Sequence, residues 1–131
     1  MKVTVDTNVL VRAVIGDDPT QAAAARRLMK SAELLAVTLP SLCEFVWVLR
    51  RVYELPREDI SNAIRSLLSV ATVQADRQAA EAGLALFAAG GDFADGVIAF
   101  EGERMGATTF ASFDRQAVKL LQAAGVQAQL P

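Results

Sequence analysis

The sequence predicts a three-layer α/β/α fold with a central parallel sheet of about five short strands. In the sequence, short runs rich in β-branched residues alternate with longer segments of helical periodicity. Strands separated by helices form parallel sheets that are covered on both faces. The 131 residues contain no linker, internal repeat or low-complexity segment. We therefore expect a single domain over residues 1–131.

The first half of the chain predicts three strands and four helices. Gly16-Asp17-Asp18 ends the first helix, and Pro19, Pro40 and Pro56 mark the starts of the next three, because proline is favoured in the first helical turn. The expected strands cover residues 2–6, 35–38 and 71–74. The expected helices cover residues 8–15, 19–33, 40–53 and 56–68.

The second half predicts three more helices and two more strands. A helix over residues 76–88 is broken by Gly90-Gly91, and a second helix follows over residues 93–105. The pattern then predicts a strand at 107–110, a helix at 114–124 and a last strand at 126–129. In folds of this kind, ligands bind beyond the carboxyl ends of the strands, to which helix N-termini also point.

The composition indicates a protein of the cytoplasm. No apolar run reaches the roughly 18 residues of a membrane span, and the first residues lack the apolar stretch of a signal peptide. The single cysteine, Cys43, cannot form an internal disulfide, as is usual in a reducing compartment. Hydrophobic residues make up 53% of the chain, which favours a large core or a surface covered by a partner. We expect Trp47 and Phe113 to pack in the core rather than stack on a nucleic-acid base.

The chain contains no histidine, and this absence excludes several kinds of active site. It removes serine and cysteine hydrolases that use a histidine base, and nearly every zinc site. Carboxylates that bind a hard cation such as Mg²⁺ or Mn²⁺ remain for difficult hydrolysis. The formal net charge of −2 argues against tight binding of duplex nucleic acid, but less strongly against a nuclease that binds cations.

Most of the 15 acidic residues lie among polar or turn residues, as Asp17 does, and we expect them on the solvated surface. Four others, Asp6, Glu44, Asp95 and Asp114, each stand beside an apolar segment at an expected strand end or helix start. This architecture gathers such places at one edge of the sheet. Carboxylates that lie close together repel one another, and a bound divalent cation compensates for the repulsion.

Each of these acids also has a structural alternative. Ser41 and Glu44 fit a capping box, in which each side chain binds a backbone N–H of the helix start. Asp92 fits the N-cap of the helix that contains Asp95, while Asp6 and Asp114 fit N-caps of their own helices. Capping does not explain the apolar surroundings of Glu44 and Asp95.

Four segments of the chain together resemble PIN-domain ribonucleases, and most of all the VapC-type toxins of bacterial toxin–antitoxin pairs. These segments are Asp6-Thr7-Asn8, the helix around Glu44, Phe93-Ala94-Asp95-Gly96-Val97-Ile98-Ala99 and Ser112-Phe113-Asp114-Arg115. The resemblance covers essentially the whole chain in order. Gly96 stands where the family commonly has alanine, and we expect it to loosen the helix start slightly.

The resemblance implies roles for individual residues. Asp6, Glu44, Asp95 and Asp114 match the acidic site of the family, which binds one or two Mg²⁺ or Mn²⁺ ions, with Asp6 and Asp95 as the foremost metal ligands. Asn8 and Ser112 match its polar companions, and Asp92 matches an accessory acid. Apart from the resemblance, arginines such as Arg115, which adjoins Asp114, and Arg12 are candidates for contacts with RNA phosphates, and a solvated surface charge is the alternative for each of them.

The resemblance also implies an activity and partners. It implies an endoribonuclease whose products carry 5′-phosphate and 3′-hydroxyl ends, a homodimer, and a cognate antitoxin that covers the acidic site. A PIN-like module that binds nucleic acid without cleaving it is the main alternative. An aspartyl-phosphate phosphatase fits less well, because it needs a second aspartate two residues after Asp6, where Asn8 stands. A receiver domain needs paired acids at the end of the first strand and a lysine late in the chain, whereas Asp17-Asp18 follow a helix and Lys119 lies within an expected helix.

Overall fold

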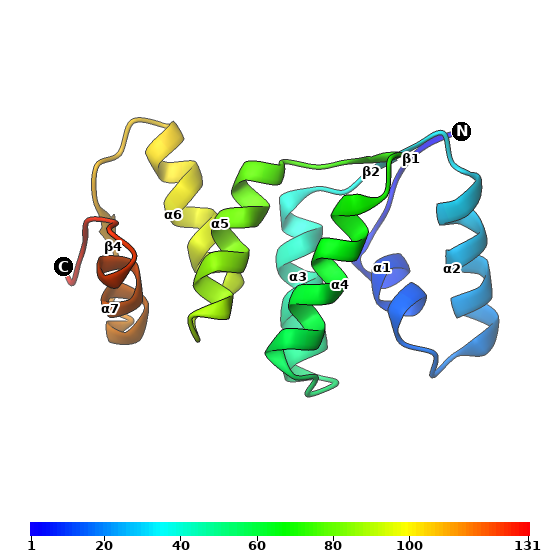
Figure 1. Ribbon diagram of the computed structural model, residues 1–131, viewed down its shortest axis with the longest axis horizontal. Coiled ribbons are helices and arrows are strands. Elements are labelled where there is room, and N and C mark those ends of the chain that lie inside the picture. Colours follow the sequence, from blue (N-terminus) through cyan, green and yellow to red (C-terminus); the bar gives the residue numbers. More distant parts are fainter. The chain divides into compact units, whose positions relative to one another are not determined.

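The computed structural model describes residues 1–131 and contains seven helices and five strands (Figure 1). The chain forms two compact units, an N-terminal unit of Met1–Asp76 and a C-terminal unit of Arg77–Pro131. All strand pairs are parallel. The predicted α/β class with parallel strands is therefore confirmed. None of the seven helices has the length and apolar character that crossing a membrane requires.

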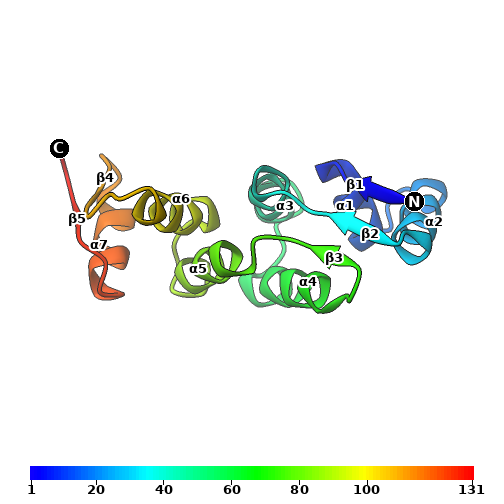
Figure 2. The ribbon, with the colours of Figure 1, turned by 90° about the horizontal axis from the view of Figure 1, so that it is seen from above.

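The N-terminal unit contains a three-stranded parallel sheet and four helices. Strand β2 lies between β1 and β3, as Figure 2 shows, and Val3 of β1 is aligned with Leu35 of β2. The elements follow the chain as β1 (Lys2–Thr4), α1 (Thr7–Val14), α2 (Pro19–Ser31), β2 (Leu34–Ala36), α3 (Leu39–Arg51), α4 (Arg57–Ser69) and β3 (Val73–Gln74).

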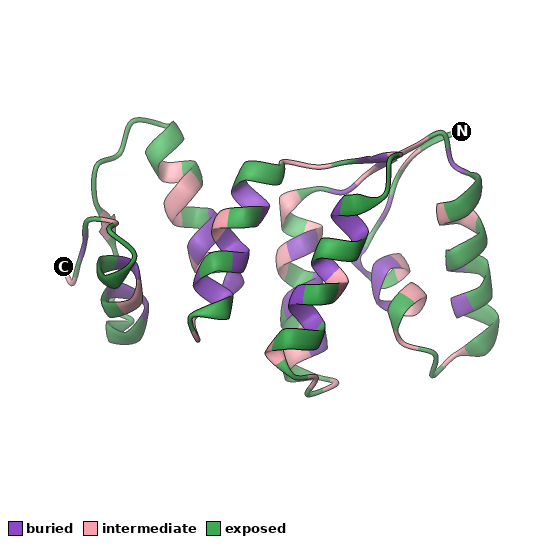
Figure 3. Cartoon of the chain, in the orientation of Figure 1, coloured by how far each residue is buried: buried purple, intermediate pink, exposed green.

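Local signals explain where these helices begin. Asp18 caps α2 by accepting a hydrogen bond from the backbone N–H of Gln21 at 3.0 Å, and Pro19 occupies the first helical position. Apolar side chains of α3 and α4 that recur at helical spacing then form the core under the sheet. Leu42, Leu49 and Ile64 are fully buried there, and the purple faces in Figure 3 mark such residues. This packing fixes α3, the helix that carries Glu44.

The C-terminal unit contains three helices and one pair of parallel strands. Its elements are α5 (Arg77–Ala88), α6 (Phe93–Arg104), β4 (Phe110–Ala111), α7 (Arg115–Ala123) and β5 (Ala128–Gln129). Leu86 of α5 joins Val118 and Leu121 of α7 in a buried cluster. The core of this unit thus connects helices that are distant in the sequence.

Helices α5 and α6 pack closely because glycine stands at their contact. A Cβ atom on Gly96 would lie 2.6 Å from the carbonyl oxygen of Ala82 and 2.9 Å from the Cα of Gly83. A Cβ on Gly83 would lie 2.8 Å from the ring of Phe93. Gly96 is thus required for helix packing, a role that the expectation of a slightly loosened helix start did not include.

All twelve predicted elements are present, most with bounds shifted by one to three residues, and the arrangement of the strands and the starts of β4 and α3 differ from the prediction. The five strands form one sheet of three and one pair, rather than a single sheet. Strand β4 begins at Phe110 instead of residue 107, because only Phe110 and Ala111 find partners, in Ala128 and Gln129. Helix α3 begins at Leu39, one residue before the predicted start at residue 40, and the side chain of Thr38 provides its N-cap.

Two aromatic residues also lie outside the core in which they were expected. Trp47 is 58% exposed and Phe113 is 84% exposed. The apolar run around Trp47 contains the positions of α3 that do pack inward, Phe45, Val46 and Leu49, while Trp47 occupies the outer face of the same helix. The prediction that these two side chains are buried is therefore wrong.

Candidate functional site

Asp6 and Glu44 lie in the N-terminal unit and line the same pocket. Asp6 follows β1 at the start of α1, and Glu44 lies on α3, which packs against α1. The pocket measures about 340 Å³, and Asn8 also lines it. Both carboxylates are solvent-exposed, and neither forms an ion pair. The structure thus brings together two of the predicted acids and one predicted polar companion.

The two acids of this pocket differ in their structural roles. Asp6 is the N-cap of α1, and its Oδ1 accepts a hydrogen bond of 2.8 Å from the backbone N–H of Thr7. Glu44 caps nothing. The N-cap of α3 is Thr38, whose hydroxyl accepts from the backbone N–H of Ser41, so Glu44 lies in the middle of the helix. The capping-box alternative for Ser41 and Glu44 is therefore wrong, and helix capping does not account for this carboxylate.

In the C-terminal unit, Asp95 lies in the first turn of α6 and is half-buried. Burial is the main cause that raises the pKa of this carboxyl group, and the negative charges of Asp92 and Asp114 raise the pKa further. The three acids are thus close enough for their charges to interact. Asp92 accepts a hydrogen bond from the backbone N–H of Ala94 at 3.2 Å and caps α6, as the capping alternative predicts.

Asp114 and Ser112 form a short turn that leads into α7. Oδ1 of Asp114 accepts hydrogen bonds from the backbone N–H groups of Gln116 at 3.0 Å and Ala117 at 3.1 Å, so Asp114 is the N-cap of α7. The hydroxyl of Ser112 accepts a hydrogen bond from the backbone N–H of Asp114 at 3.0 Å. Ser112 therefore fixes the backbone of the acid, which gives a physical role to the predicted polar companion.

The donor types suit a hard divalent cation, since carboxylate and amide oxygens are the ligands that Mg²⁺ and Mn²⁺ prefer. Glu44 and Asp95 fit this use best, because neither accepts a hydrogen bond within the chain and Asp95 repels two neighbouring acids. Neither unit by itself brings three carboxylates close enough to hold a metal ion. The expectation that all four acids gather at one site stays a prediction.

The two predicted RNA-binding arginines have different surroundings. Arg12 lines the pocket of Asp6 and Glu44, and its guanidinium donates to Asp17 and Gln21. Arg115 is exposed at the first position of α7 and forms no ion pair. Sequence reasoning missed Tyr53, which lines the same pocket and donates to Asp17. No local pattern connects these two residues, because they belong to segments far apart in the chain.

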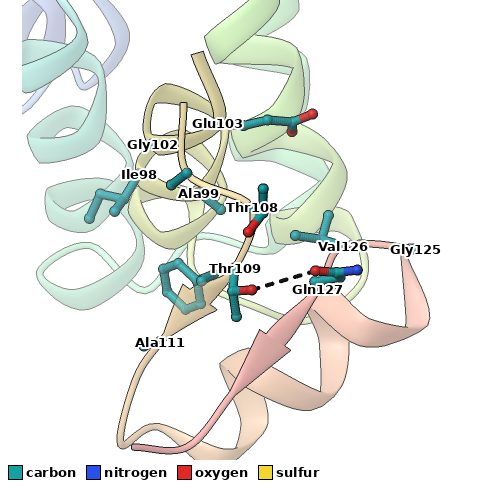
Figure 4. A pocket seen from close by; sticks show the side chains of 12 residues that line it. Ile98, Ala99, Gly102, Glu103, Thr108, Thr109, Ala111, Gly125, Val126 and Gln127 are labelled. Carbon is teal, nitrogen blue, oxygen red and sulfur yellow. Dashed lines mark hydrogen bonds between the residues drawn. The ribbon is translucent and has the colours of Figure 1, made fainter. Parts of the chain in front are cut away.

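A second pocket, of about 530 Å³, lies in the C-terminal unit between α6 and the β4–β5 strands (Figure 4). Its lining is mostly small or apolar, and Glu103 is the only charged residue among its lining residues. The hydroxyl of Thr109 donates to the side-chain oxygen of Gln127 at 3.5 Å across it. None of the predicted site residues lines this pocket, so it offers no carboxylate cluster for hydrolysis.

Comparison with known protein families matches the PIN domain to residues 3–121. The matched range includes Asp6, Glu44, Asp95 and Asp114. PIN domains are generally nuclease modules that act on nucleic acids with divalent metal ions. Comparison with curated proteins gave no match.

Proposed function

The chain belongs to the PIN-domain family, and from this membership we propose that it is a metal-dependent endoribonuclease of the VapC type. The observation that carries the proposal is the pocket of the N-terminal unit, in which Asp6 and Glu44 lie without a cationic partner. The family match takes in residues of both units, which supports the prediction of a single domain over residues 1–131.

We assign the metal to the four acids that match the family's acidic segments, Asp6, Glu44, Asp95 and Asp114. One or two Mg²⁺ or Mn²⁺ ions, when bound, lower the pKa of a water molecule and neutralise charge on the scissile phosphate. Asp6 keeps its Oδ2 free of hydrogen bonds within the chain, so it would hold a cation without giving up the cap of α1. Asp95 would be stabilised by a bound cation more than the other three acids, because burial and the negative charges of Asp92 and Asp114 all disfavour its ionised form.

The remaining residues of the proposed site hold the acids and the substrate. Ser112 fixes the backbone that carries Asp114 through its hydrogen bond to the N–H of that residue. Asn8 lines the pocket beside Asp6 and offers an amide to a phosphate or a water molecule. Arg115, exposed next to Asp114, is assigned to phosphate contacts with the RNA.

The biological role follows from the likeness to VapC-type toxins. We propose that the protein acts in the cytoplasm on single-stranded regions of RNA, and that an antitoxin silences it by covering the acidic site. A homodimer belongs to the same proposal. The exposed side chains of Trp47 and Val52 on and beside α3 support a covered surface, since large apolar groups of this kind are often buried against a partner.

An RNA-cleavage assay tests the proposal. Total RNA is incubated with the protein and Mg²⁺, and the new ends are mapped and classed by their phosphate. We expect cleavage with 5′-phosphate ends that EDTA stops, no cleavage of DNA of the same sequence, and a loss of at least about a hundredfold in rate for Glu44→Gln and Asp95→Asn. Equal cleavage by the wild type and both variants would reject the assigned site. RNA binding without any cleavage would support the non-catalytic alternative.

A further inference from the structure

Arg12 is held in place at the edge of the acidic pocket by residues of two neighbouring segments. Its Nη1 donates to Oδ1 of Asp17, in the turn after α1, at 2.8 Å. Its Nε donates to Oε1 of Gln21, on α2, also at 2.8 Å. These two contacts fix the guanidinium although its side chain is 32% exposed.

Tyr53, which follows α3, holds the other side of Asp17. Its hydroxyl donates to Oδ2 of Asp17 at 3.1 Å, so both carboxylate oxygens of Asp17 accept hydrogen bonds. Burial alone would raise the pKa of Asp17, but the hydrogen bonds from Tyr53 and Arg12 outweigh burial and lower that pKa. Asp17 therefore stays ionised at neutral pH and keeps its hold on Arg12.

The arrangement leaves part of the Arg12 guanidinium available. A guanidinium has five N–H donors, and the structure gives partners to Nε and Nη1 but none to Nη2. Arg12 lines the same pocket as Asp6 and Glu44, yet it pairs with neither of them. Nη2 of Arg12 is thus a hydrogen-bond donor without a partner, and it lies in the pocket of two acids that form no ion pair.

By holding Arg12, Asp17 also keeps the two acids of this pocket from forming an ion pair with it. An arginine with a mobile side chain would pair with Asp6 or Glu44 and compete with a metal ion for these carboxylates. Because Asp17 and Gln21 hold the guanidinium, the acids stay free for a cation while Nη2 stays free for an anion. The planar fork of arginine suits a phosphate group, which is the anion that RNA brings to this place.

We propose that Arg12 binds a phosphate group of the RNA next to the point of cleavage, and that Asp17 and Tyr53 are positioning residues that hold Arg12 for this contact. The proposal rests on the proposed ribonuclease function and adds to it a specific phosphate contact with its supporting residues. The alternative is that the network only ties α1, α2 and the end of α3 together.

The test measures RNA affinity without cleavage. A short fluorescein-labelled single-stranded RNA of mixed sequence is titrated with the Asp95→Asn protein in EDTA, at several salt concentrations, and binding is followed by polarisation. Three further substitutions are added singly to this background: Arg12→Ala, Tyr53→Phe and, as a matched control, Arg27→Ala. Arg27 is exposed on α2, forms no ion pair and does not line the pocket.

Each substitution has its own expected result. Arg12→Ala weakens binding about tenfold and lowers the slope of log K against log salt by about 0.7, the change for one phosphate contact on a single strand. Tyr53→Phe weakens binding a few-fold and leaves the slope unchanged, because the charge of Arg12 remains while its position is lost. Arg27→Ala changes both quantities much less than Arg12→Ala does. Thermal melts confirm that each variant is folded at the assay temperature.

The outcomes separate this inference from the proposed function. If the wild type cleaves RNA with Mg²⁺ but Arg12→Ala and Arg27→Ala affect binding and salt slope equally, the phosphate contact is refuted and the ribonuclease function stands. If Tyr53→Phe binds RNA as well as its parent does, the positioning role is refuted. If the Asp95→Asn parent does not bind RNA and the wild type does not cleave RNA with Mg²⁺, the proposed function fails and this inference fails with it.

Discussion

Substitution of Gly96 by alanine probes the close packing that holds Asp95 in the C-terminal unit. The new Cβ would lie 2.6 Å from the carbonyl oxygen of Ala82 and 2.9 Å from the Cα of Gly83. Both are backbone atoms, which no side-chain rotation can move away. Helices α5 and α6 must therefore separate locally, and contacts between their side chains weaken as they do so.

The expected magnitude combines two opposing effects. Overpacking of this kind costs about 1–3 kcal/mol, and the rigid backbone at Gly96 places the cost in the upper part of this range. Alanine in a helix gains about 1 kcal/mol over glycine. The free energy of unfolding should thus fall by about 1–2 kcal/mol, which for a chain of this size lowers the melting temperature by roughly 4–8 °C.

Gly102 provides a matched control on the same helix. A Cβ there meets nothing within 4 Å, so Gly102→Ala should gain only helix propensity and raise the melting temperature by a few degrees. Both variants are compared with the wild type by calorimetry under identical buffer conditions. A Gly96→Ala protein that melts as high as Gly102→Ala would show that α5 and α6 do not need this close approach.

Three further predictions concern the acids and their supports. In metal-free buffer at neutral pH, Asp95→Asn should have a free energy of unfolding higher than that of the wild type by about 1 kcal/mol or less, and should melt at a higher temperature. The raised pKa of Asp95 means that its ionisation opposes folding, and asparagine removes that charge. The difference in stability should shrink as the pH falls below the raised pKa of Asp95, and it should be lost below the ordinary value of 3.8. If Asp95→Asn is still more stable than the wild type below that pH, ionisation of Asp95 is not the cause. Glu44→Gln should leave metal-free stability unchanged within about 0.5 kcal/mol, whereas loss of the Thr38 cap by Thr38→Ala should cost about 1 kcal/mol in denaturant unfolding. Ser112→Ala should lower RNA cleavage, and Ser112→Thr should retain it by keeping the hydroxyl; equal activity in both would remove Ser112 from the site.

Local signals were sufficient to predict the class and order of the elements. Capping residues and prolines, such as Asp18 and Pro19, act within a few residues of themselves, so their effect can be seen in the sequence. The capping box at Ser41 is wrong because Thr38 provides the N-cap of α3; serine and threonine are both good N-cap residues, so their types alone do not separate the two positions. Strands of two residues, such as β4, depend on their partner strand rather than on their own composition.

Contacts between distant segments explain what the sequence could not reveal at the site. Asp17 was expected on the solvated surface, and it is exposed, but Tyr53 and Arg12 bind it from two other segments. The role of Gly96 depends on the backbone of α5, which no pattern in α6 describes. The expected apolar surroundings hold in part, because Asp95 is half-buried whereas Glu44 is solvent-exposed on an otherwise apolar stretch of α3.

The central claim is that Asp6 takes part in binding a divalent cation, and metal-dependent melting tests it most directly. The melting temperature is measured against Mn²⁺ concentration for the wild type and for Asp6→Asn, in which the amide oxygen keeps the cap of α1. The wild type should gain stability in a saturable way, by about 2.7 kcal/mol at a hundred times the dissociation constant, and Asp6→Asn should gain little. If Mn²⁺ leaves the wild type unchanged, the metal-dependent mechanism is contradicted; if Mn²⁺ stabilises both proteins equally, Asp6 serves only as a helix cap and the claim about Asp6 is wrong.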